Sequence, residues 1–168
     1  NTTVPISLPS ATNPGNSLNL CCLIRSNSLR EPIMANLDEI TREILTSVDG
    51  ALGCAVVDLS SGLLLSVSHN VPYFTQTYLE AVAAAAVDMF RGKNVQAVES
   101  LLSNQRGTDL QNSLKEMQMT TENTLHFMSI VPDKPDSLVV LITSKKTNQG
   151  MGWASIRKNL PAIAPLVP

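Results

Sequence analysis

One segment of the chain is more informative than any other: Tyr78-Leu79-Glu80-Ala81-Val82-Ala83-Ala84-Ala85-Ala86-Val87-Asp88-Met89-Phe90-Arg91. At about 3.6 residues per turn, it predicts a helix with two adjacent apolar stripes. The first stripe consists of Leu79, Val82, Ala83, Ala86, Val87 and Phe90, and the second of Tyr78, Ala81, Ala85 and Met89. The remaining line, Glu80, Ala84, Asp88 and Arg91, is the side suited to water.

A helix that covers one side of a small domain needs only one apolar stripe, so the second stripe predicts a second cover. In a short chain we expect that cover to come from another molecule. The candidate dimer contacts are Tyr78, Ala81, Val82, Ala84, Ala85 and Met89. Tyr78 and Met89 suit a protein contact, although filling the core of their own subunit would explain them equally well.

The segments before this helix carry regular signals. Asn36-Leu37-Asp38-Glu39 resembles a capping box and predicts a helix that stops just before Gly50. Residues 53–68 predict a β-hairpin that turns at Ser60-Ser61-Gly62.

The central helix itself carries a start signal and a stop signal. Thr77 and Glu80 form a second capping-box pattern at its start, and Gly92 follows its last turn. Residues 95–102 predict another short helix, because their apolar side chains share a face, and residues 104–111 predict a loop.

The C-terminal third predicts strands and a last helix. Strands are expected around residues 114–119, at 124–131 and at 138–142, with a turn over 132–136. The strand expected at residues 138–142 is continuously apolar, as in the centre of a sheet. The final helix is expected from about Gly150, with Trp153, Ile156, Leu160 and Ile163 on one face and a kink or an end near Leu160 imposed by Pro161.

Residues 1–33 differ from the rest, since Pro, Ser, Thr and Asn supply 17 of these 33 positions without helical or strand periodicity. We interpret them as a disordered N-terminal extension, upstream of a domain spanning residues 34–168. Deleting a mere extension should leave the melting temperature nearly unchanged.

Charge and cysteine content exclude several classes of function. The net charge of -2 and pI near 5.6 argue against electrostatic capture of nucleic acid or an anionic membrane. Three cysteines fit no disulfide framework, and Cys54 within an apolar run is expected to be buried, which favours a cytoplasmic protein. Membrane insertion is not expected, because no apolar run approaches the ~18–20 residues needed to span a bilayer.

The chain resembles the roadblock family of dynein light-chain-like domains, in particular its bacterial members. The resemblance rests on residues 50–62, a glycine-flanked strand ending in Asp58 before a tight turn, on the Ala-rich helix after them, and on residues 136–150, and it covers about residues 36–166. It implies an α+β, profilin-like αββαβββα fold with one five-stranded, mainly antiparallel sheet and helices on both faces.

The same resemblance implies a function without catalysis. Roadblock domains pair through the central helix and a neighbouring strand edge, as homodimers or with a related roadblock protein, and act as scaffolds and regulators of Ras-like small GTPases in polarity, motility or signalling. The expectation is therefore a non-enzymatic dimeric adaptor of a small GTPase. The connection from Gly92 to Ser113 looks longer than the family minimum, so we transfer no individual GTPase-contact residue.

Chemical sites find little support in the sequence. His69 and His126 lack metal-ligand spacing, Asp58 is explained by a turn, and Gly150-x-Gly152 lacks the rest of a dinucleotide motif. We therefore nominate no catalytic residue, no metal ligand and no cofactor. The alternative function is a profilin-like sensory module that binds a small ligand, which would require a cavity.

Overall fold

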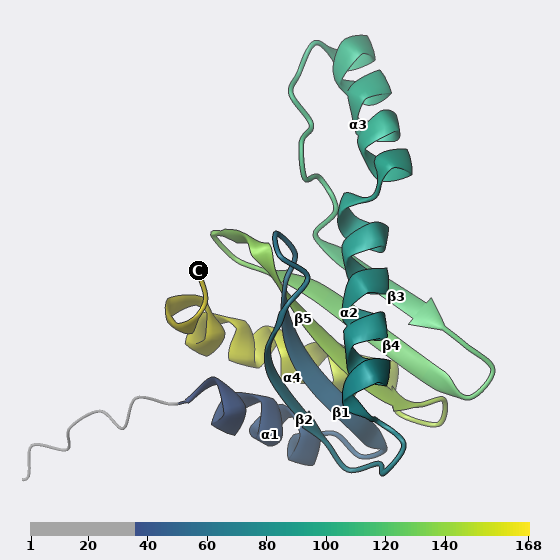
Figure 1. Cartoon of the computed structure of the whole chain (residues 1–168), viewed down its shortest axis with the longest axis vertical. Coiled ribbons are helices and arrows are strands. Elements are labelled where there is room, and N and C mark those ends of the chain that lie inside the picture. The colour runs from purple at the N-terminus through teal and green to yellow at the C-terminus, as the bar shows by residue number, and fades with distance from the viewer. Residues whose placement is uncertain (1–35) are drawn as a thin grey trace, which may run out of the picture. The chain divides into compact units, whose positions relative to one another are not determined.

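The computed structural model describes residues 36–168, which form one antiparallel sheet and the helices packed on it (Figure 1). The expected extension over residues 1–33 lies outside the described residues. In chain order the elements are α1 (Leu37–Ser47), β1 (Ala51–Asp58), β2 (Leu64–His69), α2 (Gln76–Arg91), α3 (Lys93–Arg106), β3 (Glu116–Thr120), β4 (Thr124–Val131), β5 (Lys134–Ser144), α4 (Gln149–Ile163) and a 3₁₀ turn, η1 (Ala164–Leu166).

The sheet has the strand order β2-β1-β5-β4-β3, and every neighbouring pair is antiparallel. β5 lies in the middle, and the continuous apolar run from Leu138 to Ile142 is buried because both of its faces are covered. The α+β, profilin-like arrangement expected from the sequence is confirmed.

The two faces of the sheet are covered unequally. α1 and α4 pack on one face around Ile44, Phe127 and Ile156, all fully buried. α2 covers the other face alone, through Leu79, Ala83, Ala86 and Phe90. Figure 1 shows α2 on one side of the sheet and α1 and α4 behind it.

Several predicted boundaries are confirmed. Asn36 caps α1, because its side chain accepts a hydrogen bond from the amide of Asp38. The first hairpin turns at Ser60–Gly62, where Gly62 takes a φ of +75° that suits glycine. The strand expected at residues 124–131 is β4.

The start of the central helix was predicted wrongly. Thr75, not Thr77, is the N-cap, and its hydroxyl accepts a hydrogen bond from the amide of Tyr78. The side chains of Gln76 and Glu80 bond to each other instead of completing a box. Only Thr77 has an acidic residue three positions later, but Thr75 offers the same hydroxyl, and the backbone conformation selects Thr75 as the N-cap.

The loop expected over residues 104–111 is partly helix, since α3 continues to Arg106. Gly107 ends it in the left-handed conformation, with φ at +64°, and its amide bonds to the carbonyl of Ser103. Extending an existing helix by one polar turn costs little free energy, because nucleation is already complete. The polarity of residues 104–106 was therefore a poor guide to the end of α3.

Two predictions based on proline were also wrong. Pro161 does not end the last helix near Leu160: α4 runs to Ile163, because a proline in the final turn removes one amide and the buried Ile163 holds that turn on the core. The turn after β4 is only Pro132-Asp133, with Asp133 at a φ of +60°, and β5 already begins at Lys134.

Gly152 allows α4 to approach the sheet closely, which gives a test of the packing. A Cβ there would lie 2.8 Å from two ring carbons of Phe127, which is fully buried. Gly152→Ala should therefore lower the free energy of unfolding by about 1–3 kcal/mol relative to Gly150→Ala, measured by urea denaturation. Gly150 is exposed in the same helix and serves as the control. Equal stability of the two variants would contradict this packing.

Candidate protein-interaction surface

The second apolar stripe of α2 is only partly covered by the rest of the described chain. Tyr78 is 40% exposed, Ala81 and Ala85 are exposed, and Met89 is half-buried, as is the neighbouring Val82 of the first stripe. The sequence-based expectation that this domain cannot bury both stripes therefore agrees with the structure.

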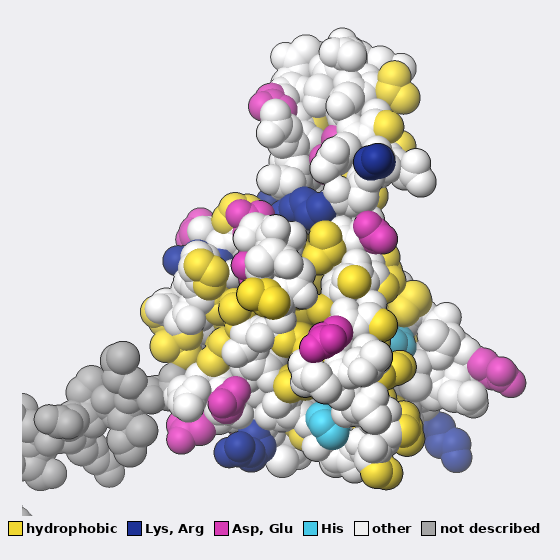
Figure 2. Space-filling view, in the orientation of Figure 1, with side chains coloured by type: hydrophobic (Ala, Val, Ile, Leu, Met, Phe, Trp, Pro, Cys, Tyr) yellow, Lys and Arg dark blue, Asp and Glu magenta, His cyan; other side chains and the backbone are white. Residues whose placement is uncertain are grey.

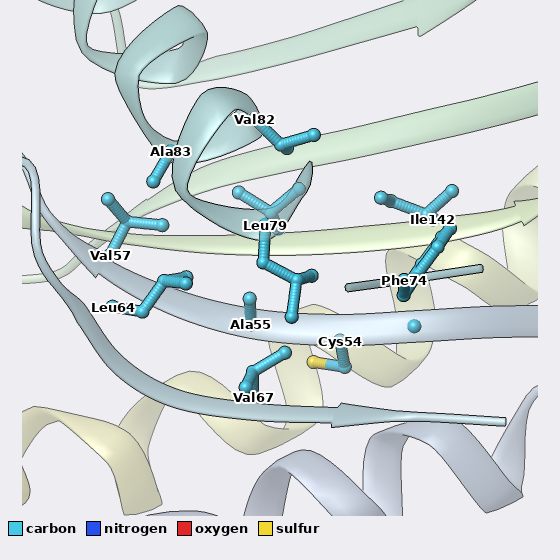
Figure 3. Close-up of a pocket in the computed structure, with 12 residues that line it drawn as sticks. Cys54, Ala55, Val57, Leu64, Val67, Phe74, Leu79, Val82, Ala83 and Ile142 are labelled. Atoms are coloured by element: carbon cyan, nitrogen blue, oxygen red, sulfur yellow. The ribbon is translucent and has the colours of Figure 1, made fainter. Parts of the chain in front are cut away.

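The two flanks of α2 differ in chemistry and in direction. One flank, which we call the apolar flank, consists of Tyr78, Val82, Ala85 and Met89, spaced three or four residues apart. In Figure 3, Val82 points to the side on which Ile142 of β5 lies, which is the side of β4 and β3. Val87 lies on the opposite flank, near Gly62 in the β1–β2 turn.

Ala84 belongs to the charged flank of α2 rather than to the apolar one. It is exposed and lies one helical turn from both Glu80 and Asp88, which are exposed too. Of the six candidate contacts, the structure thus brings together Tyr78, Val82, Ala85 and Met89, with Ala81 beside them, and leaves Ala84 on the other side.

The outer strands add residues that the sequence analysis did not nominate. Met117 and Met119 of β3 lie on the same sheet face as α2, since they pair with Met128 and His126 of β4 and belong to the core beneath α2. Both are only half-buried. Alternation of apolar and polar residues in β3 was the signal that could have identified them.

His126 lies between these methionines and the centre of the sheet. It is opposite Met119 on one side and Ile142 on the other, and its Nε2 is 2.9 Å from the hydroxyl oxygen of Thr124. Partial burial lowers the pKa of His126, so its imidazole is neutral at pH 7. A neutral ring lets this part of the surface remain uncharged, as an apolar contact requires.

Figure 2 shows hydrophobic side chains gathered along the β3 side of α2. The apolar surface is therefore formed by the apolar flank of α2 together with Met117 and Met119 of β3. Among the described strands β3 has one neighbour, β4, so its other side is an edge of the sheet.

α3 extends beyond the end of the sheet, directly after α2 (Figure 1). Its returning loop is held by Glu99, which is 9% exposed. The carboxylate accepts hydrogen bonds from the amide and hydroxyl of Ser113, each at 2.7 Å, and from the amide of Asn112 at 3.2 Å. The Ser113 hydroxyl lowers the pKa of Glu99 most, so the group is ionised at neutral pH and fixes the loop against the helix.

No ligand-sized cavity separates α2 from the sheet within the described residues. The apolar hollow there, drawn in Figure 3, has a volume of about 20 Å³ and is lined by residues such as Leu64, Val67 and Leu79. Small-molecule sites commonly need about 300–1,000 Å³. This hollow therefore gives no support to the sensory alternative.

The residues weighed as chemical groups have structural roles. Asp58 accepts hydrogen bonds from Ser60 and Ser61 in the first hairpin turn, which lower its pKa. Cys54 is buried, and burial raises the pKa of its thiol to about 12, so it is not a nucleophile at neutral pH. Within residues 36–168, no three or more His, Cys, Asp or Glu side chains are grouped as metal ligands.

Comparison with solved structures shows what fold this is. The chain is similar to a roadblock/LC7 domain from Streptomyces avermitilis, with a TM-score of 0.58 and 15% identity, over 78% of this chain and 97% of that chain. It is also similar to Myxococcus xanthus MglB, with a TM-score of 0.60 and 15% identity, over 81% and 90% of the two chains. This is a roadblock fold.

A third roadblock-fold neighbour is the gliding protein MglB from Thermus thermophilus, with a TM-score of 0.58 and 16% identity, over 77% of this chain and 86% of that chain. No family model and no curated protein matches the sequence. Among the described helices of this roadblock fold, none has the length and apolar character to cross a membrane.

The Glu99 contacts predict how firmly the α3 loop is held. Glu99→Gln removes the negative charge. It also replaces one acceptor oxygen with an NH₂ group, which cannot accept the hydrogen bond from the amide of Asn112 or Ser113. Amide exchange over residues 107–114 should then become roughly tenfold faster at neutral pH, measured by hydrogen–deuterium exchange. The control is Glu80→Gln, which changes an exposed carboxylate on α2.

The same contacts give a pH dependence. Because the folded pKa of Glu99 lies below its ordinary value of 4.5, its stabilisation is complete above that value and is lost as the pH falls through the folded pKa. The wild-type loop should loosen in that acid range, and the Glu99→Gln loop should not change further. A variant loop as protected as the wild-type loop at pH 7 would contradict this role.

Proposed function

We propose that this protein is a non-enzymatic dimeric adaptor that regulates a Ras-like small GTPase. The observation that carries the proposal is the uncovered apolar flank of α2, which continues across Met117 and Met119 to the free edge of β3. The roadblock fold supports it, because the pairing surface expected for that family falls on the same helix. The second subunit would be another copy of this chain or a related roadblock protein.

The free edge of β3 suggests how two copies would meet. Two β3 strands that pair antiparallel would extend one sheet across both subunits, related by a twofold axis normal to the sheet. That axis keeps both α2 helices on the same face and makes them antiparallel. The apolar flanks would then face each other across the axis, while the charged flanks would point away from it.

The residues available for chemistry favour an adaptor over an enzyme. Asp58 and Glu99 are engaged in local hydrogen bonds, and the Cys54 thiol is buried and protonated. A free, unbridged Cys54 is also in keeping with the cytoplasmic location that we propose. The regulatory mechanism would be steric: the joined sheets and paired helices would bind one nucleotide state of the GTPase switch loops and shift its population.

Ala85 tests the dimer surface directly. Ala85→Glu would bury an unpaired carboxylate between two apolar flanks, so the dissociation constant of the dimer should rise at least about 100-fold, measured by sedimentation velocity. The melting profile of the monomer should change little, because Ala85 is exposed in the single chain.

Ala84→Glu is the matched control, since it adds the same group one residue away on the charged flank. It should leave the dimer intact. A dimer that survives Ala85→Glu, or that is split equally by both substitutions, would place the contact elsewhere.

The GTPase part of the proposal needs a separate measurement. The wild-type protein should retain a Ras-like GTPase from native lysate more strongly with a non-hydrolysable GTP analogue than with GDP, or the reverse, with bound proteins identified by mass spectrometry. Ala85→Glu should lose that protein and Ala84→Glu should keep it. If no small GTPase is retained in either nucleotide state, the regulatory assignment fails even if the dimer is real.

A further inference from the structure

α3 presents an apolar stripe that the described chain leaves largely open. The stripe consists of Val95, Val98, Leu101 and Leu102. Val98 is 56% exposed and Leu101 is 64% exposed, whereas Val95 and Leu102 are half-buried beside Leu114. Figure 2 shows hydrophobic side chains on the same side of α3 as those along the β3 side of α2.

A second exposed apolar group lies at the N-terminal end of α2. The rings of Tyr73 and Phe74 meet edge-on at 5.4 Å, and those of Phe74 and Tyr78 stack at 5.0 Å. Phe74 is buried, but Tyr73 is 62% exposed. We call these three residues the aromatic cluster.

The α3 stripe and the aromatic cluster cannot meet within one subunit. They flank opposite ends of α2, whose 16 residues at about 1.5 Å each give a separation of roughly 24 Å. An antiparallel pair of α2 helices changes this, because it places the C-terminal end of one helix beside the N-terminal end of the other. Each α3 would then begin next to the partner's aromatic cluster.

We infer that the α3 stripe of each subunit packs against the aromatic cluster of the partner subunit, so that α3 is a second dimer contact. This inference rests on the antiparallel dimer proposed above. The contact would occur twice, once on each side of the twofold axis.

The chemistry of the two surfaces is complementary. Valine and leucine side chains face aromatic rings, and the stripe carries no charge, because Glu99 is turned into the returning loop by its bonds to Ser113 and Asn112. Those bonds also order α3 before association, so less conformational entropy is lost on binding. Hydrophobic side chains of α3 and of the apolar flank of α2 lie along the same side of the molecule, as one interface would require (Figure 2).

A double-mutant cycle across the two subunits tests the contact. Leu101→Ala and Tyr73→Ala should each raise the dimer dissociation constant about tenfold, measured by sedimentation equilibrium. The double variant should be weakened about as much as either single variant, because both remove the same contact. The control is Leu63→Ala, since Leu63 is also 64% exposed but lies in the β1–β2 turn, and it should leave the constant unchanged.

The outcomes separate the two proposals. If Ala85→Glu splits the dimer while Leu101→Ala and Tyr73→Ala behave like Leu63→Ala, the dimer stands and the α3 contact is wrong. Fully additive effects of Leu101→Ala and Tyr73→Ala would also overturn it, because the residues would then contact different things. A wild-type protein that stays monomeric at every concentration would overturn both proposals.

Discussion

A single helix cannot cover one face of a five-stranded sheet, and the interaction surface follows from this limit. Five strands about 4.8 Å apart make a sheet roughly 19 Å wide, whereas a helix with its side chains is about 10 Å wide. α2 therefore seals the residues of β1 and β5 beneath it, such as Val57 and Val140, and leaves those of the outer strands partly open. The opposite face is covered by two helices, α1 and α4, and is not left partly open in this way.

The polar contacts of β3 reinforce this difference between the faces. On the face of α4, Glu116 pairs with Arg157, and Gln118 accepts a hydrogen bond from the indole of Trp153. Those side chains fasten β3 to α4 at the surface, where each ion pair contributes little to stability but fixes the strand's position. The methionines on the other face have no such partners among the described residues, and their flexible side chains suit a surface that must fit a second molecule.

The elements with strong periodicity could be predicted from the sequence. The first hairpin, β4 and the central run of β5 follow from alternating or continuous apolar residues, and the two-sided character of α2 follows from helical spacing. The ends of helices were harder, because a Thr at 75 and a Thr at 77 offer the same hydroxyl, and only the backbone conformation chooses between them. The effect of Pro161 was overestimated, because the buried Ile163 outweighs one lost hydrogen bond.

The surface was predicted only where it belongs to one helix. Helical spacing already separates Ala84, on the line of Glu80 and Asp88, from Ala85 on the second apolar stripe, and the structure keeps the two on different flanks. Alternation in β3 places Met117 and Met119 on one face of the strand, but only strand pairing shows that this is the face of the sheet that α2 covers. Gly107 is a local stop signal that marks the end of α3, whereas the bonds of Glu99 to Asn112 and Ser113 join residues 13 and 14 positions apart, which no local pattern reports.

The junction at Gly92 determines how α3 can move. Gly92 ends α2 and also begins α3, so no linker separates the two helices. A Cβ at this position would collide with the carbonyl oxygen of Asp88, at 2.3 Å, which makes the joint tight as well as short. The 14 residues of α3 span roughly 21 Å, so a rotation of only about 10° at this single residue would carry the far end of the helix through roughly 4 Å.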